Sequence, residues 1–238
     1  NALNCAVLAT LVGRNLNMVQ HKLIQLATGA LLHDVGMIRV PASVRNKKGG
    51  LTPEELQAMQ AHPIYSYRII TKEMKFAEEI GVAALQHQER WDGQGYPRQL
   101  SGRNIAPMAR IIAVVDAFEA MVSKRPYRNS MIGYAAMRAI LSDNGRRFDP
   151  DILKVFIRTM GIYPIGSVVL LKDGRIGRVV DVNSSAPLRP LVKIMIDQNG
   201  REYHRDEGDV VNLGDQKDLF IARAVDPKDL ASRTQSAG

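Results

Sequence analysis

The sequence has few of the residues that mark several large classes of protein. Its 238 residues include one cysteine, Cys5, which excludes an intrachain disulfide framework and a thiolate zinc cluster. No apolar run approaches the roughly 20 residues that span a bilayer. No basic segment followed by an apolar stretch marks a signal peptide. Together these absences favour a protein of a reducing, cytoplasmic compartment without a membrane span in this chain.

Aromatic residues are also scarce, at 5% of the chain, and they do not interleave with the basic residues. A platform for stacking single-stranded nucleic acid is therefore disfavoured. The charge balance, in contrast, is compatible with nucleic acid. The chain has 32 Lys and Arg residues and 24 Asp and Glu residues, which gives a net charge of +8. Such a surplus favours anionic partners such as nucleotides, phosphate or nucleic acid. A basic surface with no dedicated partner explains it equally well.

Hydrophobic residues at 45% and charged residues at 24% are typical of a globular protein. From Asn1 to about Met160, apolar residues recur at intervals of three and four, which predicts helices. Thr52 followed by Pro53 predicts the start of one of them. The segment Ala2–Leu16 already has a helical pattern, so we expect an upstream region, such as a sensory domain, before it.

The pattern changes at Gly161 to short β-branched runs separated by turn signals such as Asp173-Gly174 and Asn199-Gly200. We expect strands at Val168–Leu171, Gly177–Val182 and Leu191–Ile196, with further ones near Tyr203 and at Val210-Val211. The fold class is therefore mainly α, with a helical domain over residues 1–160. A small antiparallel β barrel or sheet over 161–225 and a polar tail over 226–238 follow.

Three of the five histidines lie at or near the ends of predicted helices, and these are His33, His62 and His87. Asp34 follows His33 directly. An aspartate can bridge two cations while the neighbouring histidine binds one of them, which suits a two-metal site. Imidazole and carboxylate ligands together suit iron, manganese or zinc better than calcium. Each histidine taken alone is more often a structural residue at a helix end.

Asp116 lies in the apolar run Ile111–Ala117, which predicts a buried carboxylate. A buried charge without a partner is costly. A metal ion would offset that charge, and so would a pairing with Arg110 or Arg125. The spacing of these residues does not decide between the alternatives.

Several strings of the sequence resemble the HD-GYP branch of the HD phosphohydrolase superfamily. The resemblance covers roughly residues 1 to 160. It rests on the ordered His and Asp positions, on the loop Glu89-Arg90-Trp91-Asp92-Gly93-Gln94-Gly95-Tyr96-Pro97, and on the strings Leu51–Glu55, Arg110–Ala113, Arg125–Arg128 and Phe148–Pro150.

This resemblance implies an HD-type helical core that holds two or three divalent transition metal ions, iron or manganese above all. It also implies hydrolysis of the bacterial second messenger cyclic di-GMP to the linear dinucleotide or GMP by a metal-bound water. The implied metal ligands are His33, Asp34, His62, His87 and Asp116, with Asp34 bridging the ions and with His33 and Asp34 as the catalytic pair.

The same resemblance implies that the substrate is contacted by Gly95, Tyr96, Arg125 and Arg128. The guanidinium groups of the two arginines suit phosphate geometry. Glu89 and Asp92 are expected to shape the loop, and Glu89 is a candidate partner of His87. The Gly-Tyr-Pro loop is a candidate surface for other signalling domains. The β region is expected to extend the core, to cover the metal pocket or to form a homodimer.

Three positions depart from the family pattern. Gln88 and Asn1 stand where the family has histidine, and Met37 stands where it has lysine. Gln88 would be a weaker metal ligand through its amide oxygen, and Met37 cannot hydrogen-bond a phosphate. These departures leave an alternative to the enzyme, namely a degenerate module that binds nucleotide or a signalling partner without turnover. Another phosphate ester as substrate is a third hypothesis, and nucleic acid is the weakest.

Overall fold

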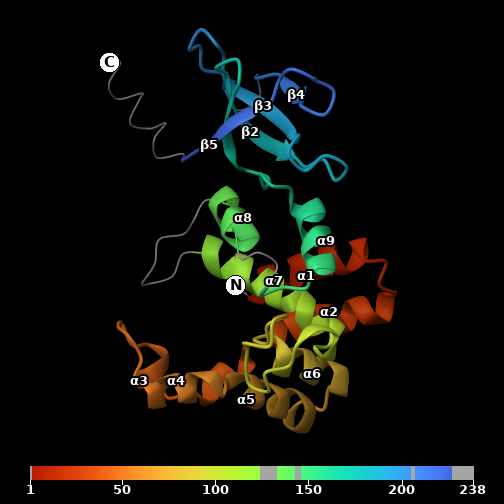
Figure 1. The fold of residues 1–238 in the computed structure, drawn as a ribbon, viewed down its shortest axis with the longest axis vertical. Helices are drawn as coiled ribbons and strands as arrows, with labels where there is room; N and C mark the ends of the chain where they lie inside the picture. Colours follow the sequence, from red (N-terminus) through yellow and green to blue (C-terminus); the bar gives the residue numbers. More distant parts are fainter. Residues whose placement is uncertain (1, 124–132, 143–145, 205–206, 227–238) are drawn as a thin grey trace. The chain divides into compact units, whose positions relative to one another are not determined.

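The computed structural model describes residues 2–123, 133–142, 146–204 and 207–226 (Figure 1). The chain divides into two compact units, and each is described here by itself. One unit comprises residues 1–130 with 140–155, and the other comprises residues 131–139 with 156–238. Within the described ranges, every helix is too short or too polar to cross a membrane.

The first unit is helical, as the spacing of apolar residues predicts. Its elements are α1 (Ala2–Asn15), α2 (Gln20–Leu32), η1 (Val35–Arg39), α3 (Ala42–Arg45), α4 (Pro53–Gln60), α5 (His62–Arg68), η2 (Ile69–Glu73), α6 (Glu78–Gln86), η3 (Gly102–Asn104) and α7 (Pro107–Val122). The helices α8 (Gly133–Ser142) and α9 (Pro150–Met160) each continue from one unit into the other.

The centre of this unit is α7, which packs against α1, α2 and α6. Its side chains Ile111, Ile112, Val114 and Val115 are almost completely buried, and so is Leu26 of α2. Burial of such side chains is the main source of stability in a domain of this kind, at about 1.5–3 kcal/mol for each. An apolar α7 thus places Asp116, its one acidic residue besides Glu119, next to the interior of the unit.

The predicted start of α4 is confirmed. The hydroxyl of Thr52 accepts a hydrogen bond from the backbone N–H of Glu55 at 3.3 Å, and the Glu55 carboxylate accepts one from the backbone N–H of Thr52 at 2.8 Å. This reciprocal arrangement is a capping box, with Pro53 in the first turn.

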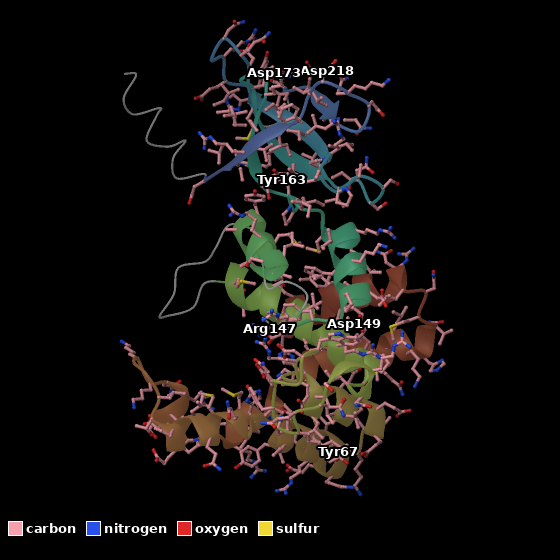
Figure 2. The ribbon with its side chains drawn as sticks, viewed as in Figure 1. Tyr67, Arg147, Asp149, Tyr163, Asp173 and Asp218 are labelled. Atoms are coloured by element: carbon pink, nitrogen blue, oxygen red, sulfur yellow. The ribbon has the colours of Figure 1, made fainter. Side chains whose placement is uncertain are left out.

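The second unit contains a five-stranded antiparallel sheet in the order β4-β3-β2-β1-β5. Its strands are β1 (Val168–Leu171), β2 (Ile176–Asp181), β3 (Leu191–Ile196), β4 (Val210–Asn212) and β5 (Ile221–Val225). The sheet is open, with β4 and β5 at its edges, so the barrel alternative is wrong. The buried side chains of the sheet form a hydrophobic cluster with other residues of the unit. The cluster includes Val169, Val179, Val192, Leu213 and Tyr163, the last of which Figure 2 labels.

The sequence missed β5 because Ile221–Val225 has only two β-branched residues and no Asn-Gly or Asp-Gly turn before it. Tyr203 lies in no strand, although its backbone N–H donates to the Met195 carbonyl at 2.8 Å. The predicted polar tail, residues 226–238, lies outside the described residues except for its first residue, Asp226.

Candidate metal centre

His33 and Asp34 lie where α2 ends and η1 begins, and this junction packs tightly against α5. The backbone N–H of Gly36 donates to the Ser66 hydroxyl at 2.9 Å. A Cβ atom at Gly36 would lie 2.2 Å from the carbonyl oxygen of His62, so only glycine allows this approach. The close approach of η1 to α5 brings Asp34 beside His62.

The three helix-end histidines share one arrangement. The Nδ1 atom of each ring lies 2.7–2.8 Å from a backbone carbonyl oxygen three residues earlier, in Ala30, Met59 and Ala84. A carbonyl oxygen only accepts, so each Nδ1 carries the proton and donates. In its neutral form each ring presents the lone pair of Nε2, the form that ligates metals.

All three Nε2 atoms face Asp34. Its Oδ1 lies 3.2 Å from His62 Nε2 and 3.4 Å from His87 Nε2, and its Oδ2 lies 3.5 Å from His33 Nε2. Oδ1 of Asp116 lies 3.5 Å from His33 Nε2. The structure therefore brings together all five side chains that the sequence analysis named as candidate ligands. The side chains of His33 and His87 are buried, whereas Asp34 is 48% exposed and opens the cluster to solvent.

The charges and the burial of this cluster shift the pKa values of its members. Burial would lower the pKa of His33, but the contact with Asp116 and the negative charge of Asp34 outweigh it and raise that pKa to about 9, so the two carboxylates favour positive charge at this position. Desolvation would raise the pKa of Asp34, yet its contacts with His62 and His87 hold that pKa well below its ordinary range. Burial lowers the pKa of His87, which favours its neutral form.

A bound cation fits these residues. Nε2 of His33 is a buried nitrogen without a hydrogen-bond partner among the described residues. Nε2 of His62 and Nε2 of His87 lie 3.4 Å apart, and neutral rings with Nδ1 protonated have no proton to share between these atoms. Ligand atoms of His33, Asp34 and His87 all lie within 4.8 Å of one another. Three imidazole nitrogens and two carboxylates form a donor set that suits a divalent transition metal.

The Gly-Tyr-Pro loop is held beside the cluster by Glu89. This buried carboxylate accepts hydrogen bonds from the backbone N–H groups of Arg98 at 2.7 Å and of Leu100 at 3.0 Å. Glu89 thus shapes the loop, as the sequence analysis expects, and these bonds direct its carboxylate to the loop rather than to His87. A Cβ atom at Gly95 would lie 2.4 Å from the backbone nitrogen of Arg90, so the loop closes only on glycine.

Tyr96 follows Gly95 and precedes a cis peptide bond to Pro97. Its ring meets the His62 ring edge to face, with centroids 6.2 Å apart. Burial and the nearby carboxylates of Asp34 and Asp116 raise the pKa of Tyr96 to about 12, so its hydroxyl remains a hydrogen-bond donor at neutral pH. The other predicted loop residue, Asp92, pairs with Arg90 at 2.7 Å.

Glu119 is a site-proximal residue that the sequence analysis missed. It lies one turn after Asp116 on α7 and is buried. Its Oε1 accepts hydrogen bonds from the Asn4 side-chain amide at 2.9 Å and from the Ser123 hydroxyl. The contact ties α1 to α7 beside the cluster. A second acid three residues after Asp116 in an apolar helix is the signal that could have found it.

Of the remaining predicted residues, the structure describes Gln88 and Met37 but not the other three. Gln88 is half-buried, and its backbone carbonyl accepts a hydrogen bond from the Tyr96 N–H at 3.2 Å. Met37 lies on η1, where its carbonyl accepts from Arg45 Nη1 at 3.0 Å. Residues Asn1, Arg125 and Arg128 lie outside the described residues.

The alternative pairing of Asp116 with Arg110 is wrong. Nη1 of Arg110 lies 2.5 Å from Oδ2 of Asp149, which Figure 2 labels, and both side chains are largely buried.

Family models match both units. A model described as an HD domain matches residues 1–152, and one described as a KOW domain associated with HD domain matches residues 168–233. The curated protein named cyclic di-GMP phosphodiesterase PdeB, of Borreliella burgdorferi, is 30% identical over 87% of this chain and 54% of its own length. Cyclic di-GMP phosphodiesterase PA4108, of Pseudomonas aeruginosa, is 34% identical over 80% of this chain and 45% of its own length. This chain thus spans about half the length of these relatives.

A solved structure shares the fold. Bd1817 of Bdellovibrio bacteriovorus, titled a HDG"Y"P protein, superimposes with a TM-score of 0.55 at 20% sequence identity. The match covers 65% of this chain and 49% of that protein.

Proposed function

Because the chain belongs to the HD domain family, in its HD-GYP branch, we propose that it is a metal-dependent phosphodiesterase that hydrolyses cyclic di-GMP. One observation carries the proposal. Three imidazole Nε2 atoms converge at 3.2–3.5 Å on Asp34, with their Nδ1 protons fixed by backbone carbonyls. Nε2 of His33 is buried without a hydrogen-bond partner among the residues that the structure describes, and a bound cation would supply that partner.

We assign the metal ligands to His33, Asp34, His62, His87 and Asp116. Asp34 is the central ligand because both of its oxygens face imidazole nitrogens, which suits a carboxylate shared by two ions. When bound, iron or manganese ions would neutralise phosphate charge and lower the pKa of a water molecule for attack on phosphorus. Asp116 lies on the Nε2 side of His33 as a further ligand, and the carbonyls of Ala30, Met59 and Ala84 orient the three rings.

The substrate contacts come from the loop beside the ligands. Tyr96 donates its hydroxyl to the bound dinucleotide, and Gly95 allows the loop to approach closely. Arg125 and Arg128 are proposed to bind its phosphates or guanine. Glu89 keeps the loop in place through two backbone N–H groups. The expected product is the linear dinucleotide or GMP.

Turnover tests this proposal directly. Protein purified without oxygen and loaded with Mn²⁺ or Fe²⁺ is incubated with cyclic di-GMP, and the products are separated by chromatography. We expect cleavage by the parent chain and a loss of more than roughly 100-fold in the His33→Ala/Asp34→Ala double variant, because even partners outside the ligand sphere contribute 10–100-fold. His21→Ala is the matched control, since His21 is exposed on α2.

The same assay separates the enzyme from the degenerate module. A module that only binds nucleotide would retain cyclic di-GMP intact with every metal tested, and that result would overturn the proposed activity. Cleavage of 3′3′-cyclic GMP-AMP at an equal rate would overturn the assignment of cyclic di-GMP as the preferred substrate while leaving the phosphodiesterase in place.

A further inference from the structure

A groove of about 400 Å³ lies on the sheet of the second unit, over β2, β3 and the segment that follows β3. Its walls include Arg178, Val180, Lys193, Met195, Tyr203 and His204. Side chains alternate across a strand, and Val179 and Val192 belong to the buried core of this unit. Arg178 and Lys193 therefore lie on the opposite, outer face of the sheet.

Two cations stand side by side in this groove. Arg178 of β2 and Lys193 of β3 are directly opposite each other in the antiparallel register. Like charges in directly opposite positions destabilise a sheet. Across residues 146–204 and 207–226, neither cation has a carboxylate within the 4.0 Å of an ion pair. An anion bound between them would relieve the repulsion, and a phosphate group can accept hydrogen bonds from both.

The other walls of the groove suit a planar, partly apolar group. Tyr203 is held on β3 by its backbone N–H bond to Met195. The Arg201 guanidinium lies 5.3 Å from the Tyr203 ring centroid, and the Tyr203 hydroxyl donates to the Asp197 carboxylate at 3.4 Å, so both contacts hold the ring in place. Val180 and Met195 supply apolar surface, and His204 supplies a second ring. Bases stack on such surfaces, while inorganic phosphate would use only the cations.

We propose that this groove binds a nucleoside phosphate, with the phosphate between Arg178 and Lys193 and the base against Tyr203. Its volume is at the small end of the range for ligand sites, which suits a single nucleotide rather than a strand. All seven residues that line the groove, Ile194 included, belong to the second unit. The proposal therefore does not depend on the activity of the metal centre.

Calorimetric titration tests the site, with GMP and AMP as probes. The protein is the full chain carrying Asp34→Asn and treated with chelator, so that nucleotide cannot bind through metal ions. We expect saturable binding of at least one probe, weakened by roughly tenfold or more in Arg178→Gln/Lys193→Gln, since one charge-assisted hydrogen bond of 1.5–3 kcal/mol corresponds to about that factor. The matched control, Lys217→Gln/Arg223→Gln, removes two exposed charges of the same unit and should change the affinity by less than about twofold.

Several outcomes would overturn the proposal. The double variant could bind as the parent does, or guanosine could bind as tightly as GMP, which would exclude a phosphate contact. Inorganic phosphate could bind as tightly as GMP, which would exclude a base contact. A single-stranded oligoribonucleotide could bind through these residues while mononucleotides do not, which would make the surface a polynucleotide site. Circular dichroism verifies folding, and Lys193→Gln alone replaces the double variant if that variant unfolds.

Discussion

Replacing Glu89 by glutamine should destabilise the loop beside the metal centre. The Glu89 carboxylate is 4% exposed, and its two oxygens accept from the backbone N–H groups of Arg98 and Leu100. Glutamine keeps one oxygen acceptor and turns an amide N–H group toward the other donor. The variant therefore loses one charge-assisted hydrogen bond and leaves a buried donor facing a donor.

The expected loss follows from these contacts. A hydrogen bond to a charged group contributes about 1.5–3 kcal/mol, and a buried unsatisfied donor costs about 1–3 kcal/mol. Because the loop can relax toward solvent, we expect a decrease of about 2–3 kcal/mol in the free energy of unfolding of the first unit. With a urea slope of about 2 kcal/mol/M, the unfolding midpoint should fall by about 1–1.5 M.

Trp91 provides the assay because it is the only tryptophan and lies two residues after Glu89. Its backbone N–H donates to the carbonyl of Arg147, a residue that Figure 2 labels, so its fluorescence reports on this part of the first unit. Tryptophan fluorescence at about 340 nm is measured as urea is added to the parent and to the variant.

The matched control is Glu79→Gln, since Glu79 is 53% exposed and pairs with Lys22 at 3.4 Å. Exposed pairs contribute little, so the unfolding midpoint of this variant should stay close to that of the parent. Equal midpoints for Glu89→Gln and Glu79→Gln would refute the role given to Glu89.

Two further substitutions test the packing that positions the site. Gly36→Ala should lower the melting temperature strongly in a thermal unfolding scan, because its Cβ would lie 2.2 Å from the His62 carbonyl; Gly49→Ala, with nothing within 4 Å, should not. Arg110→Gln should lower the free energy of unfolding by about 1.5–3 kcal/mol in urea titrations, since it removes the charged donor to Asp149 Oδ2 while the backbone N–H groups of Asp151 and Ile152 still bond Oδ1. A melting temperature of Gly36→Ala equal to that of Gly49→Ala, or a loss below about 1 kcal/mol in Arg110→Gln, would contradict the packing described.

The sequence predicted local features well, because their causes lie within a few residues. Apolar periodicity gives the helices, and Thr52 with Glu55 gives the capping box. The family strings also pointed to the five residues that converge at the cluster. Their convergence depends on contacts between elements, such as the approach of Gly36 to α5.

Features that arise only in three dimensions were not predictable in this way. The protonation of the three imidazole rings is set by carbonyls that each helix end presents. The partner of Arg110, Asp149, is 39 residues away in the chain. Whether the sheet closes depends on its edge strands β4 and β5. The sequence pattern of β5 is too weak to predict that strand.

The central claim is that His33, Asp34, His62, His87 and Asp116 bind divalent transition metals, and a calorimetric titration of Mn²⁺ into chelator-treated protein tests it most directly. The account predicts saturable binding of two ions by the parent, unchanged binding by His21→Ala, and affinity weakened by more than roughly 100-fold in Asp34→Asn. Absence of saturable binding by the parent, or equal binding by Asp34→Asn, would contradict it.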